Sequence, residues 1–127
     1  MKNVVSSTSA PAAIGPYSQA ITANGFVFAS GQLPIDPSTG GFPEGGVTAQ
    51  SEQSIKNLKT VLTEAGCSLD DVVKTTVFLK DIGDFAAMND VYSQHFKQQC
   101  PARSAIEVAN LPKGAVVEIE AIAVLPK

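Results

Sequence analysis

Three side chains in this sequence have types and positions that could do chemistry: Arg103, Glu118 and Tyr17. Arg103 follows a Pro-Ala pair at the start of a predicted strand. An arginine there usually forms a surface ion pair, but its planar guanidinium also suits a small carboxylate, which it can hold through two hydrogen bonds. Glu118 is either a solvated carboxylate or a group that orients or deprotonates water. Tyr17 either packs against a hairpin or donates its hydroxyl at a pocket rim.

Other residues that often do chemistry carry little signal. The sequence has no GxGxxG, P-loop, HExxH, GxSxG or acidic calcium-loop motif. The one histidine, His95, lies beside an apolar helix stripe, which favours a structural role and makes no metal site by itself. Cys67 and Cys100 have no zinc spacing and are too few for a disulfide framework. We expect two reduced thiols that flank the helices, and no metal.

The candidate residues must be positioned by elements that the residue pattern predicts. Asn24-Gly25 is a hairpin turn. One helix begins with Thr48 as its N-cap and runs to about residue 65, and a second is capped by Asp84 and runs to about residue 98. Strands are predicted at residues 17–21, 26–30, 72–80, 103–108 and 116–125. The predicted apolar stripes are Ile55, Leu58, Leu62 and Ala65 in the first helix and Phe85, Met88, Tyr92 and Phe96 in the second.

The order β-β-α-β-α-β-β predicts a single α+β domain over residues 1–127, with one sheet and both helices on one of its faces. The last strand predicts what each face is like, because its side chains alternate. The helix-packed set is apolar: Val117, Ile119, Ala121, Ala123 and Leu125. The opposite set is half acidic and half apolar: Glu118, Glu120, Ile122 and Val124. Such a face suits contact between subunits around a polar pocket.

Composition supports association between copies of the chain. Charged residues make up 17% of 127 residues, against about 25% in an ordinary soluble domain. A monomer of 13.2 kDa should expose roughly 6,400 Å², which these charges cover sparsely. We therefore expect part of the surface to be buried in a homo-oligomer.

The same composition argues against several partners. The net charge is -3 and the isoelectric point is near 5.0, with no basic cluster of the kind that binds nucleic acid. No charged start leads into an apolar run, and no apolar run approaches the length of a membrane span. We expect a soluble cytoplasmic protein without nucleic-acid or membrane partners.

Six motifs along essentially the whole chain together resemble the RidA group of the Rid/YjgF family. They are residues 12–19 (AAIGPYSQ), 30–34 (SGQLP), 73–78 (VKTTVF), 88–92 (MNDVY), 101–104 (PARS) and 118–123 (EIEAIA). The resemblance implies a chorismate-mutase-like fold in a homotrimer around a central barrel, with three clefts between subunits. It also implies hydrolysis of reactive 2-imino acids such as 2-iminopropanoate and 2-iminobutanoate, which enamines from pyridoxal-phosphate dehydratases form, to 2-keto acids and ammonia, without a cofactor.

Matched residue by residue, the resemblance implies that Arg103 holds the substrate carboxylate and Glu118 positions the attacking water. The residues that would shape the cleft and bind the imine or keto end are Tyr17, Ser30, Gly31 and Asn89. Ala105 stands where many relatives carry cysteine, so it supplies only backbone groups and no thiol chemistry. Two other readings stay open: an endoribonuclease or translation inhibitor, and a trimer that binds small molecules or acts like a chaperone without turnover.

Overall fold

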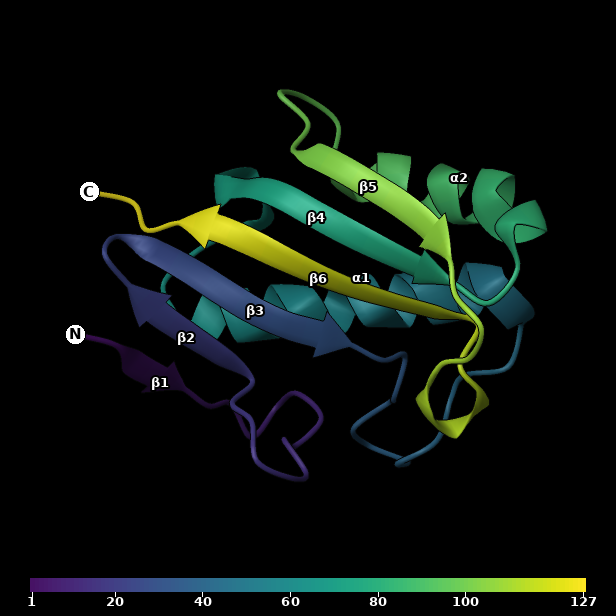
Figure 1. Cartoon of the computed structure of the whole chain (residues 1–127), viewed down its shortest axis with the longest axis horizontal. Coiled ribbons are helices and arrows are strands. Elements are labelled where there is room, and N and C mark those ends of the chain that lie inside the picture. The colour runs from purple at the N-terminus through teal and green to yellow at the C-terminus, as the bar shows by residue number, and fades with distance from the viewer.

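The computed structural model describes all of residues 1–127 and contains one six-stranded sheet with two helices. Helices α1 (Gly46–Glu64) and α2 (Phe85–His95) lie on one face of the sheet, behind the strands in Figure 1. The other face, here called the open face, has no helix over it. In sheet order the strands are β1 (Asn3–Val5), β2 (Ala20–Ala23), β3 (Phe26–Gln32), β6 (Val117–Val124), β4 (Val72–Leu79) and β5 (Ala102–Glu107). The predicted α+β class with both helices on one face is confirmed.

Strand pairing places the last strand at the centre of the sheet. β6 pairs antiparallel with β3 on one side and with β4 on the other. β5 is an edge strand that pairs with β4 in parallel, and α2 makes the crossover between them. A bulge interrupts the β3–β6 register between Ala29 and Gln32, so Ser30 and Gly31 leave the regular ladder.

The Asn24-Gly25 turn is confirmed, because both residues have the positive φ, 52° and 81°, that a tight hairpin turn requires. The strand before it begins at Ala20 instead of residue 17. The backbone just before Ala20 is held by Ser30, whose hydroxyl donates to the Ser18 carbonyl at 2.6 Å and whose N–H donates to the Gln19 carbonyl at 2.9 Å. β1 was not predicted, because only one of its three residues is buried and it has no apolar pattern.

Both predicted helix boundaries need correction. α1 begins at Gly46, not Thr48, and its N-cap is Gly45 in the left-handed region at φ 119°, without a side-chain cap. Asp84 is the N-cap residue of α2, as predicted, but its side chain makes no capping hydrogen bond. α2 ends at His95, three residues early, because Phe96 leaves the helical region and stacks its ring on Tyr92 at 4.4 Å between ring centres.

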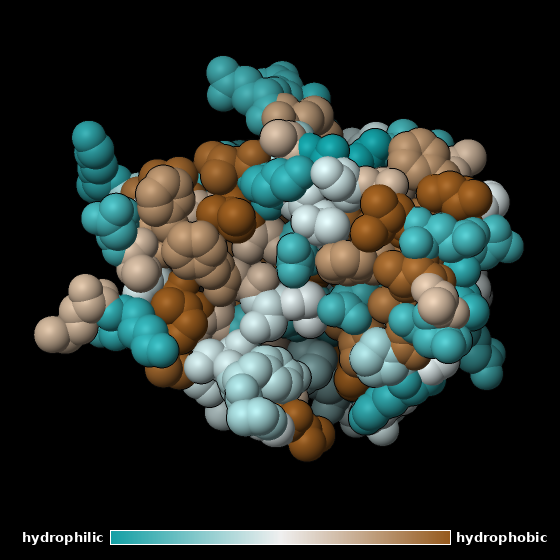
Figure 2. All heavy atoms as spheres, viewed as in Figure 1, coloured by the Kyte–Doolittle hydropathy of each residue, from teal (hydrophilic) through white to brown (hydrophobic).

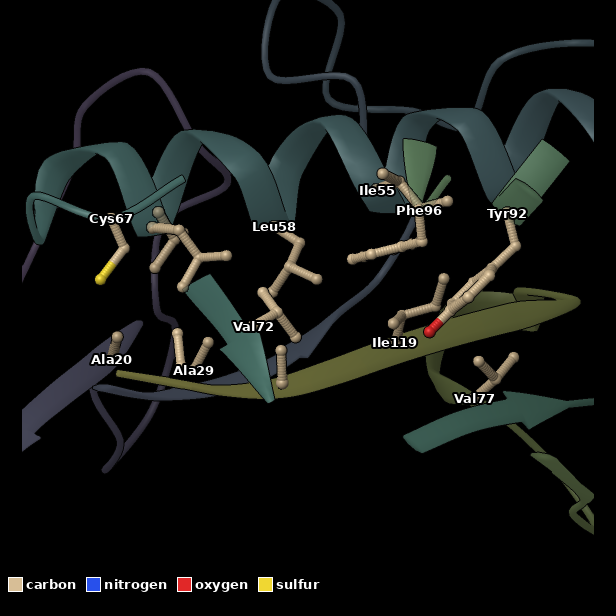
Figure 3. Close-up of a cluster of buried hydrophobic side chains, with 14 of the residues drawn as sticks. Ala20, Ala29, Ile55, Leu58, Cys67, Val72, Val77, Tyr92, Phe96 and Ile119 are labelled. Atoms are coloured by element: carbon tan, nitrogen blue, oxygen red, sulfur yellow. The ribbon is translucent and has the colours of Figure 1, made fainter. Parts of the chain in front are cut away.

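The core lies between the helices and the sheet (Figure 3). Ile55, Leu58 and Leu62 of α1 and Ile119 of β6 are fully buried there, and each stabilises the fold by about 1.5–3 kcal/mol through removal of apolar surface from water. The α2 stripe differs from the prediction at two positions. Phe85 is 36% exposed, and Val91 is buried in addition to the other predicted residues.

The open face is apolar at one end. Phe26, Phe28 and Val124 are exposed there, and Figure 2 shows apolar side chains gathered where β3 begins and β6 ends. The alternation predicted for residues 117–124 is confirmed. The chain exposes 7015 Å², more than the roughly 6,400 Å² typical of its mass. Neither helix has the length and hydropathy that a membrane span requires.

Candidate functional site

Arg103 lies on the edge strand β5 and reaches over α2. It is in register with the buried Thr75 of β4, which places it toward the helix-covered side. Its Nη1 donates a hydrogen bond to Asn89 Oδ1 at 2.7 Å. Its Cζ lies 4.7 Å from the centre of the Tyr92 ring and 5.3 Å from that of Phe85. Because residues 85, 89 and 92 share one face of a helix, α2 presents a continuous cradle to the guanidinium.

An open hollow of about 380 Å³ adjoins this guanidinium, lined by Asn89, Tyr92, Ser93, Phe96, Cys100, Pro101 and Arg103. Arg103 has no acidic partner, because the one ion pair of the chain joins His95 to Glu52 at 2.6 Å. The remaining guanidinium N–H groups and the Asn89 Nδ2 are therefore available to donate to a carboxylate or carbonyl oxygen. Arg103 and Asn89, predicted separately, come together in one site.

The two cysteines differ in surroundings. Cys67 is buried, and burial, followed by the negative charge of Asp71, raises the pKa of its thiol. Cys100 is exposed and lines the same hollow as Arg103, with its Sγ 3.3 Å from the Phe96 carbonyl oxygen. Cys100 thus follows α2, as expected, and in addition lies at the candidate site. Its place three residues before Arg103 was the signal that could have located it.

Ala105 lies two residues after Arg103 on β5, in register with the buried Val77. Its methyl group packs against the hydrophobic core. Only its backbone lies along the free edge of the sheet, since β5 has no partner on its outer side. The position thus offers backbone groups to a ligand.

Glu118 lies half-buried on the open face, beside Gly31 of the β3 bulge. A Cβ on Gly31 would lie only 2.8 Å from the Glu118 Cδ and closer still to its carboxylate oxygen, so glycine leaves the space that this side chain fills. Burial raises the pKa of Glu118, and the neighbouring charge of Glu120 raises it further. A carboxylate with a raised pKa accepts a proton more readily than an ordinary one, as a general base must.

Tyr17 and Ser30 are both near Gly31, the glycine that leaves room for Glu118. Tyr17 is 54% exposed and lines a small hollow of about 40 Å³ together with Gly31. The Ser30 hydroxyl donates to the Ser18 carbonyl, so it fixes the loop that carries Tyr17. Through Gly31 these residues form a second group with Glu118.

The two groups do not meet within one chain. Arg103 is in register with Thr75, and Glu118 with Phe78 three residues further along β4. Because side chains alternate along a strand, Arg103 and Glu118 lie on opposite faces of the sheet, with backbones roughly 14 Å apart for strands of ordinary spacing. A small substrate held by both residues therefore needs a second copy of the chain.

Comparison with known proteins assigns the family. The family model described as Endoribonuclease L-PSP matches residues 7–125. The chain belongs to this family. A relative within it, the 2-iminobutanoate/2-iminopropanoate deaminase of Mus musculus, is 50% identical over 124 residues, which are 98% of this chain and 92% of that protein.

Solved structures of family members superpose closely on this chain. The YjgF gene product of E. coli has a TM-score of 0.92 at 46% identity and covers 96% of this chain and 98% of its own. E. coli TdcF with bound serine has a TM-score of 0.93 at 43% identity, covering 98% of this chain and 99% of its own. The resemblance to the Rid/YjgF family is confirmed, and so is the α+β fold of the single chain.

Proposed function

We propose that this chain is a hydrolytic deaminase that converts 2-imino acids, such as 2-iminopropanoate and 2-iminobutanoate, to 2-keto acids and ammonia. The observation that carries the proposal is the 50% identity over nearly the whole chain to a protein named for this activity. The serine bound to TdcF supports an amino-acid-like ligand with a carboxylate. Arg103, held by the neutral Asn89 and two aromatic rings, suits that carboxylate.

In the proposed reaction, Arg103 binds the substrate carboxylate and leaves the imine carbon facing Glu118. A water molecule attacks that carbon of the protonated imine while Glu118 accepts one of the water protons, which forms a tetrahedral carbinolamine. Glu118 returns this proton to the amino group, the C–N bond breaks, and the hydroxyl proton passes to the departing ammonia as the keto group forms. Water and protonated imine thus become keto acid and ammonium, and the protein chiefly supplies orientation and one proton acceptor. Tyr17 and the Ser30-Gly31 backbone shape the cleft.

We propose that each cleft lies between two copies in a homotrimer, one supplying Arg103 and the next supplying Glu118. The opposite orientation of these side chains in one chain supports this arrangement. So does the exposed apolar end of the open face, which a neighbouring copy would cover. The exposed edge of β5 would then border the cleft, with Ala105 contributing backbone groups.

The test adds the purified protein to a pyridoxal-phosphate-dependent threonine dehydratase, which is the class of enzyme expected to release the substrate. Release of 2-oxobutanoate, followed through lactate dehydrogenase, should accelerate. Arg103→Ala should reduce kcat/KM by at least about 100-fold, since a charge-assisted pair contributes about 1.5–3 kcal/mol and positioning adds to it. Arg103→Lys keeps the charge but loses the planar guanidinium. Its kcat/KM should lie between those of the wild type and Arg103→Ala. Unchanged acceleration by Arg103→Ala would refute the site.

The family description also names an endoribonuclease. The charges of this chain, 9 basic against 12 acidic residues, disfavour a phosphate backbone as ligand. A binding-only role is distinguished by Glu118→Gln, which we expect to bind pyruvate with unchanged affinity while turnover falls at least about 100-fold. Equal turnover by Glu118→Gln would remove Glu118 from the mechanism.

A further inference from the structure

We propose that Tyr92, anchored by Thr75, is a positioning residue that orients the Arg103 guanidinium for carboxylate binding. The inference rests on the proposed role of Arg103 and extends the site to two residues in the core. Neither residue was singled out for chemistry from the sequence, where Tyr92 belongs to an apolar helix stripe. The Arg103 guanidinium nevertheless lies over the Tyr92 ring, with its Cζ 4.7 Å from the ring centre.

The Tyr92 ring is fixed from both the sheet and the helix. Its hydroxyl and the Thr75 hydroxyl share a hydrogen bond of 2.8 Å between two residues that are 5% and 0% exposed. Figure 3 shows the ring pointing from α2 with its hydroxyl toward the strands. Phe96 stacks on the ring at 4.4 Å between centres. A buried ring that is both hydrogen-bonded and stacked has one orientation, so it provides a rigid platform.

The chemistry of the cradle explains why a ring is used here and not a carboxylate. Aromatic faces attract a guanidinium through their quadrupole, and the Asn89 amide oxygen accepts from it without carrying a charge. Arg103 is therefore held in place while its positive charge stays unneutralised. An acidic partner would orient Arg103 equally well but would compete with the carboxylate of the ligand.

The experiment measures pyruvate affinity by isothermal titration calorimetry and KM and kcat in the dehydratase-coupled assay. Tyr92→Leu, which removes the ring, should raise both Kd and KM about tenfold and leave kcat within about twofold. Tyr92→Phe keeps the ring and loses only the hydrogen bond to Thr75, so Kd and KM should rise about threefold. Thr75→Val should match Tyr92→Phe, and the double variant should be no worse than either single one, since both remove the same hydrogen bond.

A matched control separates positioning from general damage to α2. Val91→Ala removes buried volume from the neighbouring position of the same helix, and Val91 is not part of the cradle. It should lower the melting temperature without changing Kd or KM. In addition, the Arg103 Nε–H resonance, shifted by the ring current of Tyr92, should move in Tyr92→Leu and stay in Val91→Ala. An unmoved resonance, or equal KM changes in Tyr92→Leu and Val91→Ala, would overturn the proposal.

Failure of this inference is distinguishable from failure of the proposed function. If the wild-type protein binds pyruvate but does not accelerate keto-acid release, the deaminase proposal fails, and a weaker Kd in Tyr92→Leu still supports the role of Tyr92. If the wild type is active and Tyr92→Leu has an unchanged Kd and KM, only the role of Tyr92 fails. If the wild type neither turns over substrate nor binds pyruvate, both fail, because no carboxylate is then held by Arg103.

Discussion

Glu118 and Glu120 occupy alternate positions on β6 and share the open face of the sheet. Because the pKa of Glu118 is raised, this carboxylate becomes protonated at a higher pH than an ordinary one. Activity that needs a deprotonated Glu118 should therefore fall on the acid side with an apparent pKa above the ordinary value of 4.5. The measurement is kcat/KM against pH.

Glu120→Gln tests the cause of that shift. Removing the neighbouring negative charge lowers the pKa of Glu118, so the acid limb of the profile should move to lower pH. The acid limb should not move all the way to the pH of an ordinary carboxyl, because burial is the larger cause of the raised pKa and stays in place. An acid limb at the same pH in Glu120→Gln would show that Glu118 is not the group that titrates.

The space above Gly31 gives a second prediction at this scale. In Gly31→Ala the new methyl group would displace the Glu118 side chain, since the two would overlap. We expect kcat/KM to fall at least about tenfold and the free energy of unfolding by about 1–3 kcal/mol. Urea unfolding of a double-mutant cycle with Glu118→Ala checks the contact: Gly31→Ala should destabilise that background less. Equal destabilisation in both backgrounds would argue against the overlap.

The roles of these residues could be predicted only in part from the sequence. Types and motif positions indicated Arg103, Asn89, Gly31 and Glu118. They did not indicate that Asn89 accepts a hydrogen bond from Arg103, because that contact joins two elements 14 residues apart. The spacing of Phe85, Asn89 and Tyr92 could have predicted the cradle had Arg103 been placed over it.

At the scale of elements, a side chain of α1 holds the loop that follows β3. The buried Asn57 donates from Nδ2 to the carbonyl oxygens of Leu33 at 3.0 Å and Ile35 at 2.8 Å. Asn57→Leu leaves both carbonyls without this donor and should lower the free energy of unfolding by about 2–3 kcal/mol. Gln53→Ala, which removes only the side-chain partner of Asn57, should lower it by less than about 1 kcal/mol. Urea unfolding at fixed protein concentration measures the free energy of unfolding of both variants. Equal losses of stability would show that the hydrogen bonds from Asn57 to the loop contribute nothing.

Element types were more predictable than element ends. The alternation in β6 and the Asn24-Gly25 turn depend on local pattern and local φ, which the residues themselves dictate. The start of α1 depends on Gly45, whose left-handed conformation leaves no side-chain signal. β1 depends on pairing with β2 and not on its own burial, so its three residues carried no sufficient pattern.

At the scale of the whole molecule, the exposed area of 7015 Å² and the apolar end of the open face support assembly. Phe28 is 44% exposed and packs near Phe26 at 6.1 Å between ring centres. A charge there should prevent a neighbouring copy from covering this face. We expect Phe28→Glu to sediment as a monomer of 13.2 kDa, while the wild type sediments at three times that mass.

Thr63→Glu is the matched control for that experiment, because it adds the same charge on the exposed side of α1. It should leave the mass of the assembly unchanged. Phe28→Glu should also lose activity, since the monomer would lack complete clefts. A trimeric Phe28→Glu protein, or an active monomer, would contradict the assignment of this face.

Assembly also marks the limit of sequence-based prediction for the site. The motifs that contain Arg103 and Glu118 were expected to form one site, but Arg103 lies on β5 and Glu118 on β6, with β4 between them. Which face each side chain takes depends on the register of β4 with β5 and with β6. That register is a tertiary property, and it is what separates the two residues within a chain.

Subunit complementation tests the shared cleft most directly. Arg103→Ala and Glu118→Ala proteins, each inactive alone, are co-expressed in equal amounts and purified as mixed trimers through two different tags. If each cleft takes Arg103 from one copy and Glu118 from the next, every mixed trimer has one cleft in three with both residues intact. We expect about a third of wild-type activity to return. Activity no higher than that of the separate variants would contradict a site shared between copies.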